Sequence, residues 1–482
     1  MSVMRFSEIL LKSKGESQKP MNAISRNPKT YRQPTLPVLG LALFLAACGA
    51  DEKPKLDGER ISVLNFERAL AVDPRVSEQA VILPPVFRNS DWPNPGGYAS
   101  HAAYHLALDG NQQAFKVNAV SGNTADLRLK GAPVVGDGKV FALGAELDVS
   151  ALDATTGKIM WQTSVAAQDT EPNRGLTRFL GFGEKAVDIE DGFGGGLAYN
   201  DGRVFVTTGF GEITALSAET GDVIWQIRNS VPFSNAPTIR AGRLYAVSRD
   251  SRLQVISTQD GSRLWEHLAI TELATVIGAT SPAVDSRMVV AGFNSGEIVA
   301  LNSINGRVAW SDSLTSRATQ VTPLSELNAI VGRPVIDGDR VFAVSHGGRM
   351  VSIDMRTGER IWTADIGSIE TPWVLGDFIF VVTLDGQVVC LSSAQGRVRW
   401  VSQLPAFEDP DDREGRINWT GPVLASGKIY VASSTGEMLA LDPANGEISE
   451  RVDLGEPVNL PPVVADGTIY FLTDDGSLIA RR

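Results

Sequence analysis

An eleven-residue phrase recurs through the chain and constrains its fold more than any other feature. The first copy, Ala151–Trp161, reads Ala-Leu-Asp-Ala-Thr-Thr-Gly-Lys-Ile-Met-Trp. Further copies lie at residues 215–225, 255–265, 300–310, 352–362, 390–400 and 440–450, the last with glutamate in place of tryptophan. Self-similarity at a period of about 40 to 50 residues indicates a repeat architecture, in which each unit packs on its neighbours.

Each position of the phrase has a physical role. The third residue is always short and polar, as in Asp153, and such side chains close turns by accepting backbone N–H groups. The glycine four residues later, Gly157 in the first copy, supplies the positive φ that other residues resist. The final residue places a large aromatic face on the next strand. These tryptophans are expected to pack between neighbouring units: Trp161, Trp225, Trp265, Trp310, Trp362 and Trp400.

A second hairpin precedes each phrase. Asp137-Gly138 and Asp201-Gly202 separate pairs of apolar runs, which is a strong short-range hairpin signal. One unit therefore contains four antiparallel strands and forms a blade. Eight units begin near Ala132, Leu197, Ala236, Ser281, Arg333, Thr371, Gly421 and Pro461.

The eighth unit runs out of chain after its third strand, at 476–480. An open blade would leave unpaired backbone groups at its edge, which folded proteins avoid. Residues 113–120 precede the first blade and carry Phe115 where the other units have tryptophan. We therefore expect this N-terminal strand to complete the last blade and to close the ring.

The N-terminal region predicts export. Arg26, Lys29 and Arg32 precede an apolar run over 36–47 that ends in Leu45-Ala46-Ala47-Cys48, a pattern typical of a secretory signal and too short for a spanning helix. An ordinary cleaved signal or a short buried helix are the alternatives. The signal is long, and Met21 is a second candidate start. Residues 1–47 are thus assigned to a signal peptide, 48–112 to a Pro- and charge-rich tether whose last part wraps the domain surface, and 113–482 to the blades.

Composition and motifs exclude several functions. The net charge is −12 and the repeats contain no Lys/Arg cluster, which argues against nucleic acid as a partner. Cys390 occupies a slot held elsewhere by alanine, so an inert core thiol is expected. His101 and His105 lack the further ligands of a metal site, and the glycines of 192–196 lack a phosphate-loop lysine. We expect no catalytic residue, metal or cofactor.

The complete phrase of 151–161 resembles the tryptophan-docking motif of pyrroloquinoline-quinone-type propellers, which implies an eight-bladed β-propeller. Leu45–Cys48 resembles the bacterial lipobox, which implies acylation of Cys48. Together they resemble the BamB family, lipoproteins of the machinery that folds and inserts outer-membrane β-barrels. The quinoprotein dehydrogenases share the repeat, but characteristically carry an adjacent cysteine pair that this chain lacks.

The BamB resemblance implies a non-catalytic scaffold on the periplasmic side of the outer membrane. It also implies a partner, the periplasmic domains of the barrel subunit BamA, bound through loops leading into the fourth and fifth blades, with incoming outer-membrane proteins as possible clients. The matching residues are Val276, Ile277, Ala329 and Val331. Val276 keeps the family's apolar character, whereas the other three replace an arginine and two aspartates. These residues could instead be buried at strand starts. A quinone-dependent oxidoreductase and a periplasmic ligand- or protein-binding propeller remain the alternative functions.

Overall fold

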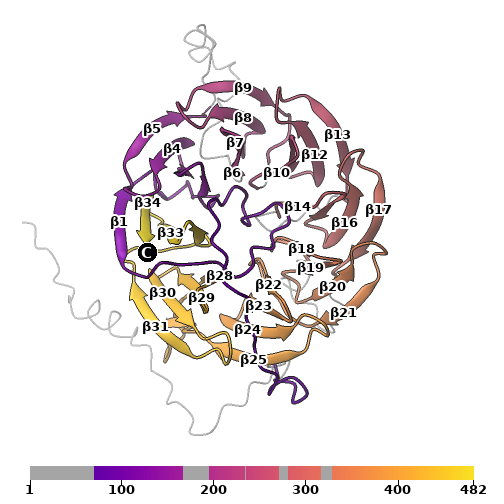
Figure 1. Ribbon diagram of the computed structural model, residues 1–482. Coiled ribbons are helices and arrows are strands. Elements are labelled where there is room, and N and C mark those ends of the chain that lie inside the picture. The colour runs from indigo at the N-terminus through magenta and orange to yellow at the C-terminus, as the bar shows by residue number, and fades with distance from the viewer. Residues whose placement is uncertain (1–69, 167–194, 234, 271–279, 316–327) are drawn as a thin grey trace, which may run out of the picture. The chain divides into compact units, whose positions relative to one another are not determined.

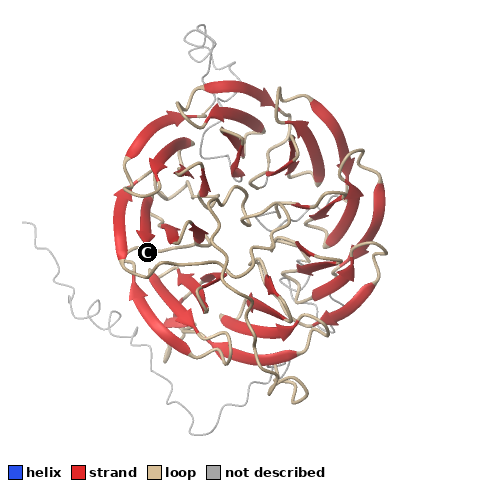
Figure 2. Ribbon diagram, in the orientation of Figure 1, coloured by secondary structure: helices blue, strands red, loops and turns tan. Residues whose placement is uncertain are grey.

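The computed structural model describes residues 70–166, 195–233, 235–270, 280–315 and 328–482. Strands in these ranges form eight four-stranded antiparallel sheets and one two-stranded hairpin. Figure 1 shows the eight sheets arranged around a common axis, and Figure 2 shows that strands are the only regular structure drawn. The predicted all-β, eight-bladed propeller is confirmed. The described residues contain no helix that is long and apolar enough to cross a membrane.

Within blades one to seven the strands follow chain order from the axis to the rim (Figure 1). The strands of blades one to four are β2 (Val134–Gly136), β3 (Lys139–Leu143), β4 (Asp148–Asp153), β5 (Ile159–Ser164); β6 (Gly195–Asn200), β7 (Arg203–Thr208), β8 (Glu212–Ser217), β9 (Val223–Arg228); β10 (Thr238–Arg240), β11 (Arg243–Val247), β12 (Arg252–Ser257), β13 (Arg263–Leu268); and β14 (Ala283–Val284), β15 (Met288–Gly292), β16 (Glu297–Asn302), β17 (Val308–Ser313).

The strands of blades five to eight are β18 (Val335–Asp337), β19 (Arg340–Val344), β20 (Met350–Asp354), β21 (Arg360–Ala364); β22 (Trp373–Leu375), β23 (Phe378–Val382), β24 (Gln387–Ser392), β25 (Val398–Gln403); β28 (Trp419–Ala425), β29 (Lys428–Ser433), β30 (Glu437–Leu441), β31 (Ile448–Asp453); and β32 (Val463–Ala465), β33 (Thr468–Leu472), β34 (Ser477–Arg481). The hairpin β26 (Phe407–Asp409) and β27 (Glu414–Arg416) lies between blades six and seven.

The eighth blade takes its outer strand from the N-terminal side of the domain. β1 (Gln113–Asn118) pairs antiparallel with β34, with Phe115 opposite Ala480 and Val117 opposite Leu478. This pairing confirms the predicted closure of the ring. It also satisfies the backbone groups that β34 would otherwise present at an open edge.

The repeat tryptophans join each blade to the next. Trp161 of blade one lies on Gly221 in the phrase of blade two, so close that a Cβ atom on Gly221 would come within 2.6 Å of the ring. The indole Nε1 of Trp161 donates to the Ala218 carbonyl at 3.1 Å. The same stacking on glycine recurs for Trp225, Trp265, Trp310, Trp362 and Trp400. Only glycine leaves room for the ring and also adopts the positive φ of the turn, which is +77° at Gly221.

Two junctions replace the indole hydrogen bond. At the closure, Phe115 lies on Gly157 and has no N–H to offer, and the Tyr470 hydroxyl donates to the Ala154 carbonyl at 3.0 Å instead. Between blades three and four, the hydroxyl of Tyr245 donates to the Ser303 carbonyl at 3.0 Å. A phenol from the second strand of the preceding blade therefore satisfies the carbonyl that an indole satisfies elsewhere.

The junction between blades seven and eight is polar. Glu450 occupies the tryptophan position of blade seven and forms an ion pair with Lys428 at 3.0 Å. It also accepts a hydrogen bond from the side chain of Asn111, which itself binds Arg481 of β34. Asn111, rather than a phrase glycine, meets this position of blade seven. An indole there would have no glycine on which to lie, which explains the loss of the tryptophan.

Residues 70–112 pack on the propeller, although they were expected to belong to a tether. Asp73 N donates to Val398 O at 2.8 Å, so the chain enters at the rim of blade six. We call residues 87–109 the crossing segment, because they run through the centre of the ring and return to its rim at β1 (Figure 1). Residues 96–109, part of the stretch expected to wrap the domain surface, belong to this segment.

The crossing segment bonds to the innermost strand of every blade or to its flanking residues. Its partners, in blade order, are Val135, Tyr199, Ile239, Val284, Ile336, Trp373, Leu424 and Asp466. At the axis, the ring of Trp92 stacks on Trp373 of blade six with centroids 6.4 Å apart, while the backbone of Trp92 pairs with Val135 of blade one. Blades one and six are not neighbours, so Trp92 spans the middle of the ring.

We expect the docking tryptophans to dominate blade cohesion. Trp362 is 8% exposed, lies on Gly396 and donates to Ser393 O at 2.8 Å. Trp362→Ala should lower the free energy of unfolding by about 3–5 kcal/mol, because it leaves a cavity between blades five and six. The matched control is Ile361→Ala at the 42% exposed neighbour, which should change it by less than about 0.5 kcal/mol. Urea unfolding followed by tryptophan fluorescence measures both, and equal losses would contradict the docking role.

Candidate functional site

The two faces of the ring differ. In blade one Ala154 N donates to Gly138 O at 3.0 Å, so the turn after the first strand lies beside the turn after the third. We call this side the turn face, and the crossing segment covers its centre by bonding to Asp137 and Asp466 in such turns. The opposite side, the loop face, carries the turns after the second strands and the connections between blades. The long connections between blades one and two and between blades four and five therefore start and end on the loop face.

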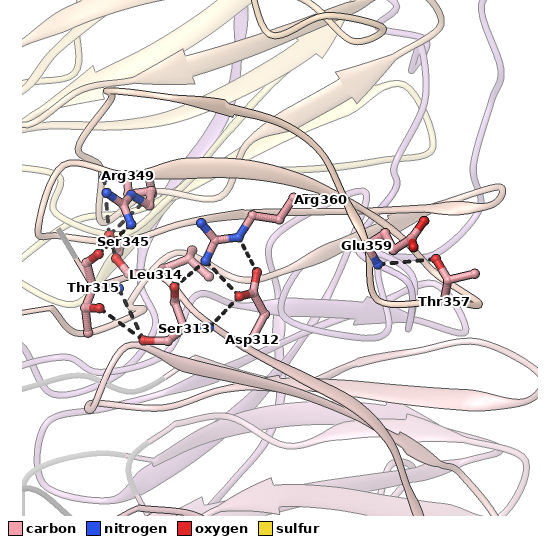
Figure 3. A network of polar contacts seen from close by, with 9 residues as sticks. All are labelled: Asp312, Ser313, Leu314, Thr315, Ser345, Arg349, Thr357, Glu359 and Arg360. Carbon is pink, nitrogen blue, oxygen red and sulfur yellow. Dashed lines mark hydrogen bonds and ion pairs between the residues drawn. The ribbon is translucent and has the colours of Figure 1, made fainter. Parts of the chain in front are cut away.

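The connection between blades four and five begins in a network of polar contacts (Figure 3). Arg360 of β21 forms a two-pronged ion pair with Asp312 of β17, with N–O distances of 2.5 and 2.7 Å. The same guanidinium also donates to the Ser313 carbonyl. Arg349 donates to the Thr315 carbonyl at 2.6 Å, and Ser345 Oγ donates to the Leu314 carbonyl at 3.3 Å. Blade five thus holds the strand end from which this connection leaves blade four.

The electrostatics of this network favour a fixed geometry. The side chains of Arg360 and Asp312 are 31% and 19% exposed, so the pair is partly withdrawn from water. The hydrogen bond to Asp312 raises the pKa of Arg360 above its ordinary value. A planar guanidinium that meets a carboxylate with two parallel bonds is more specific than a single ammonium contact. The first residues of the connection are therefore positioned by blade five itself.

The predicted partner-binding residues lie in different environments. Val276 and Ile277 fall outside the described residues. Ala329 is 1% exposed and Ile330 is 0% exposed, and Ile330 packs against Gly292 of blade four. Val331 is partly exposed. The side chain of Ala329 thus belongs to the packed start of blade five, which is the alternative raised for it, whereas Val331 faces the surface of the loop face.

One structured element of this face was not predicted. The hairpin β26–β27 carries the exposed acidic residues Glu408, Asp409, Asp411, Asp412 and Glu414. Its sequence signal is weak, because each strand has only three residues. The one available cue was the Asp-Pro-Asp-Asp run at 409–412, a turn-forming sequence between two short segments.

The remaining candidates from the sequence have structural partners. His101 Nδ1 lies 2.8 Å from the Pro334 carbonyl and His105 Nδ1 lies 2.7 Å from that of Pro84. Burial, with a contribution from Arg333, lowers the pKa of His101 to about 3, so its ring is neutral. Cys390 is fully buried opposite Trp400, and burial raises the pKa of its thiol. Within the described ranges, no three acidic, histidine or cysteine side chains gather as metal ligands would.

Comparisons with known proteins give one family and a wider fold group. The family model described as "Outer membrane protein assembly factor BamB" matches residues 70–178, 180–402 and 408–481. The protein of that name from Yersinia pestis is 27% identical over 230 residues, which are 48% of this chain and 55% of the relative. The chain spans about half the length of the first curated relatives it matches.

Two solved structures share the fold. The crystal structure of BamB from Moraxella catarrhalis aligns with a TM-score of 0.61 and 20% identity, covering 77% of this chain and 99% of that one. Quinohemoprotein alcohol dehydrogenase from Comamonas testosteroni aligns with a TM-score of 0.60 and 14% identity, covering 82% and 81%. At these identities the two structures show a common propeller and do not distinguish the functions.

We expect the network at the blade-four exit to depend on the shape of the guanidinium. Arg360→Lys should lower the free energy of unfolding by about 1–2 kcal/mol, because lysine replaces several charge-assisted bonds with a point contact. It should also speed hydrogen exchange at residues 312–315. Glu359→Gln, at the exposed neighbour drawn in Figure 3, is the control and should leave both unchanged. Hydrogen exchange at residues 312–315 that is as slow in Arg360→Lys as in the parent chain would contradict this positioning role of Arg360.

Proposed function

Because the chain belongs to the BamB family of outer membrane protein assembly factors, we propose that it is a non-catalytic scaffold of the outer-membrane β-barrel assembly machinery. In this role it binds the periplasmic domains of a BamA-type barrel subunit and assists the folding and insertion of outer-membrane proteins. The single observation that carries the proposal is the match of the family model across all eight blades and the crossing segment. The named role of relatives such as the Yersinia pestis protein supports it.

The division of the ring into two faces supports a docking role for the loop face. The crossing segment occupies the centre of the turn face and bonds to all eight blades, so that face is already covered at its middle. The loop face carries the connections into blades four and five, and its blade-four exit is held by Arg360 and Asp312. A fixed platform lowers the ordering cost of binding a partner.

The packing at the axis supports a non-catalytic role. Quinoprotein dehydrogenases bind their quinone on the ring axis. Here Trp92 stacks on Trp373 across the axis, and Leu106 and Ala103 of the crossing segment pack in the same apolar core. Apolar side chains of the crossing segment therefore fill part of the middle of the ring. The oxidoreductase alternative is supported by the shared fold.

We expect the barrel subunit to accompany the tagged chain when it is purified from envelopes in mild detergent. Val331→Asp should reduce the recovered barrel subunit several-fold, because it puts a charge in the partly exposed apolar position before blade five. Val308→Asp makes the same change at a 51% exposed site on the outer strand of blade four, and should leave recovery unchanged. Thermal melts of both variants verify folding. Recovery of no barrel subunit with the parent chain would refute the function.

We also propose that Cys48 carries the lipid that holds the chain on the periplasmic face of the outer membrane. Support comes from the lipobox-like residues Leu45–Cys48 after the basic and apolar stretches. Several acyl chains anchor firmly, because each buried methylene contributes about 0.8 kcal/mol. Cys48→Ala should abolish labelling by radioactive palmitate and release the chain from the membrane fraction. Undiminished labelling of the variant would place the lipid elsewhere.

A further inference from the structure

We propose that a recess between blades six and seven on the loop face binds a basic side chain, arginine or lysine, of a polypeptide partner. The recess has a volume of about 260 Å³. Its walls come from the connection into blade six, the turn after β23 and the start of blade seven, and Glu370 and Trp419 are among the lining residues. The site adjoins one of the positions to which the family resemblance points, because Gly332, which follows Val331, packs against the backbone of Glu370. Binding of a basic side chain there is not part of the proposed function.

Glu370 supplies the acidic group of the recess. Its Oε2 accepts hydrogen bonds from Thr420 Oγ1 and from Gly421 N, each at 3.2 Å. These two bonds come from blade seven, so the carboxylate bridges the blades and its direction is fixed. A carboxylate that is positioned before binding loses little freedom when a cation reaches it, which favours a specific contact over a transient one.

The charged and polar groups around Glu370 leave it available as an anion partner. Arg333 of blade five attracts the Glu370 carboxylate, but its guanidinium Nη1 donates to Thr371 Oγ1 at 3.1 Å. Arg416 of the hairpin donates to the Leu384 carbonyl. From blade eight, Asn459 reaches the recess and donates to Asp474 at 2.8 Å. Arg416 and Nη1 of Arg333 thus bond to other acceptors, whereas the buried Nε of Arg333 has no hydrogen-bond partner among the described residues.

Burial has the largest effect on Glu370 and raises its pKa to about 7. Near neutral pH the carboxyl is therefore partly protonated. A cation that enters the recess stabilises the ionised form, so binding should release a proton and should strengthen as the pH rises through 7. Below pH 6 the carboxyl is mostly neutral and the attraction is lost.

The walls match the aliphatic part of a basic side chain. Ile369 is 44% exposed, and Ile417 and Leu384 line the same recess. Arginine and lysine carry apolar methylene groups before their charged head, so they can cover such walls while the head meets Glu370. The acidic hairpin β26–β27 continues directly into Ile417 and adds negative charge next to the recess, which favours the approach of cations and disfavours acidic segments.

The test uses the purified full-length chain and two peptides, acetyl-Leu-Arg-Leu-amide and the same peptide with neutral citrulline in place of arginine. By titration calorimetry at pH 8, the arginine peptide should bind at least about tenfold more tightly, as expected for one charge-assisted pair. At pH 7 its binding enthalpy should vary with the ionisation enthalpy of the buffer, because a proton is released. Trp419 should report the same event through a shift of its indole N–H resonance.

Glu370→Gln keeps an oxygen for Thr420 and Gly421 and should abolish both the preference for arginine and the proton release. The matched control is Glu408→Gln on the hairpin, which removes one exposed carboxylate and should keep both. Equal binding of the two peptides to the parent chain, absence of any binding, or an unchanged preference in Glu370→Gln would overturn the proposal. No barrel subunit takes part, so these outcomes are independent of co-purification.

Discussion

The contact of a tryptophan with the glycine of the next blade is the interaction on which the propeller depends. It requires a large ring at one end of the phrase and a residue without a side chain at the other, and both lie in one eleven-residue stretch. The first residue of the phrase pairs directly with the tryptophan, as Ala151 does with Trp161, which explains why it is small in most copies. Blades one to six each contribute a tryptophan ring to the next blade, so neighbouring blades stabilise one another through these interfaces.

The two departures from this rule lie on either side of the eighth blade, where the chain closes on itself. Phe115 stands in for a tryptophan and Tyr470 supplies the missing hydrogen bond. On the other side, Glu450 meets Asn111 and Arg481 instead of a glycine. The closure thus combines one apolar junction with one polar junction. The crossing segment adds contacts to all eight blades, and so ties the N-terminal side of the domain to every part of the ring.

The fold could be predicted from the sequence because its signals are local and repeated. Turn residues, alternating strands and the phrase all lie within one unit, and the closing strand follows from counting strands. The crossing segment could not be predicted in this way, since its bonds, such as those with Ile239 and Val464, are distributed over eight blades and follow no repeated pattern in the sequence. The recess at Glu370 could not be predicted for the same reason, because its lining comes from three blades and no motif links them. Of the partner-binding residues, only Ala329 and Val331 lie in the described chain, the first buried and the second partly exposed.

A ring held by docked tryptophans and closed at its N-terminal side should unfold as one unit. Hydrogen exchange with mass spectrometry tests this most directly, by comparing peptides from β1 and the crossing segment with a peptide from the buried strand β23. If the ring is closed as described, the slowest amides of all three regions should exchange with similar free energies of opening. Exchange of β1 or the crossing segment within seconds, while β23 stays protected, would contradict the account.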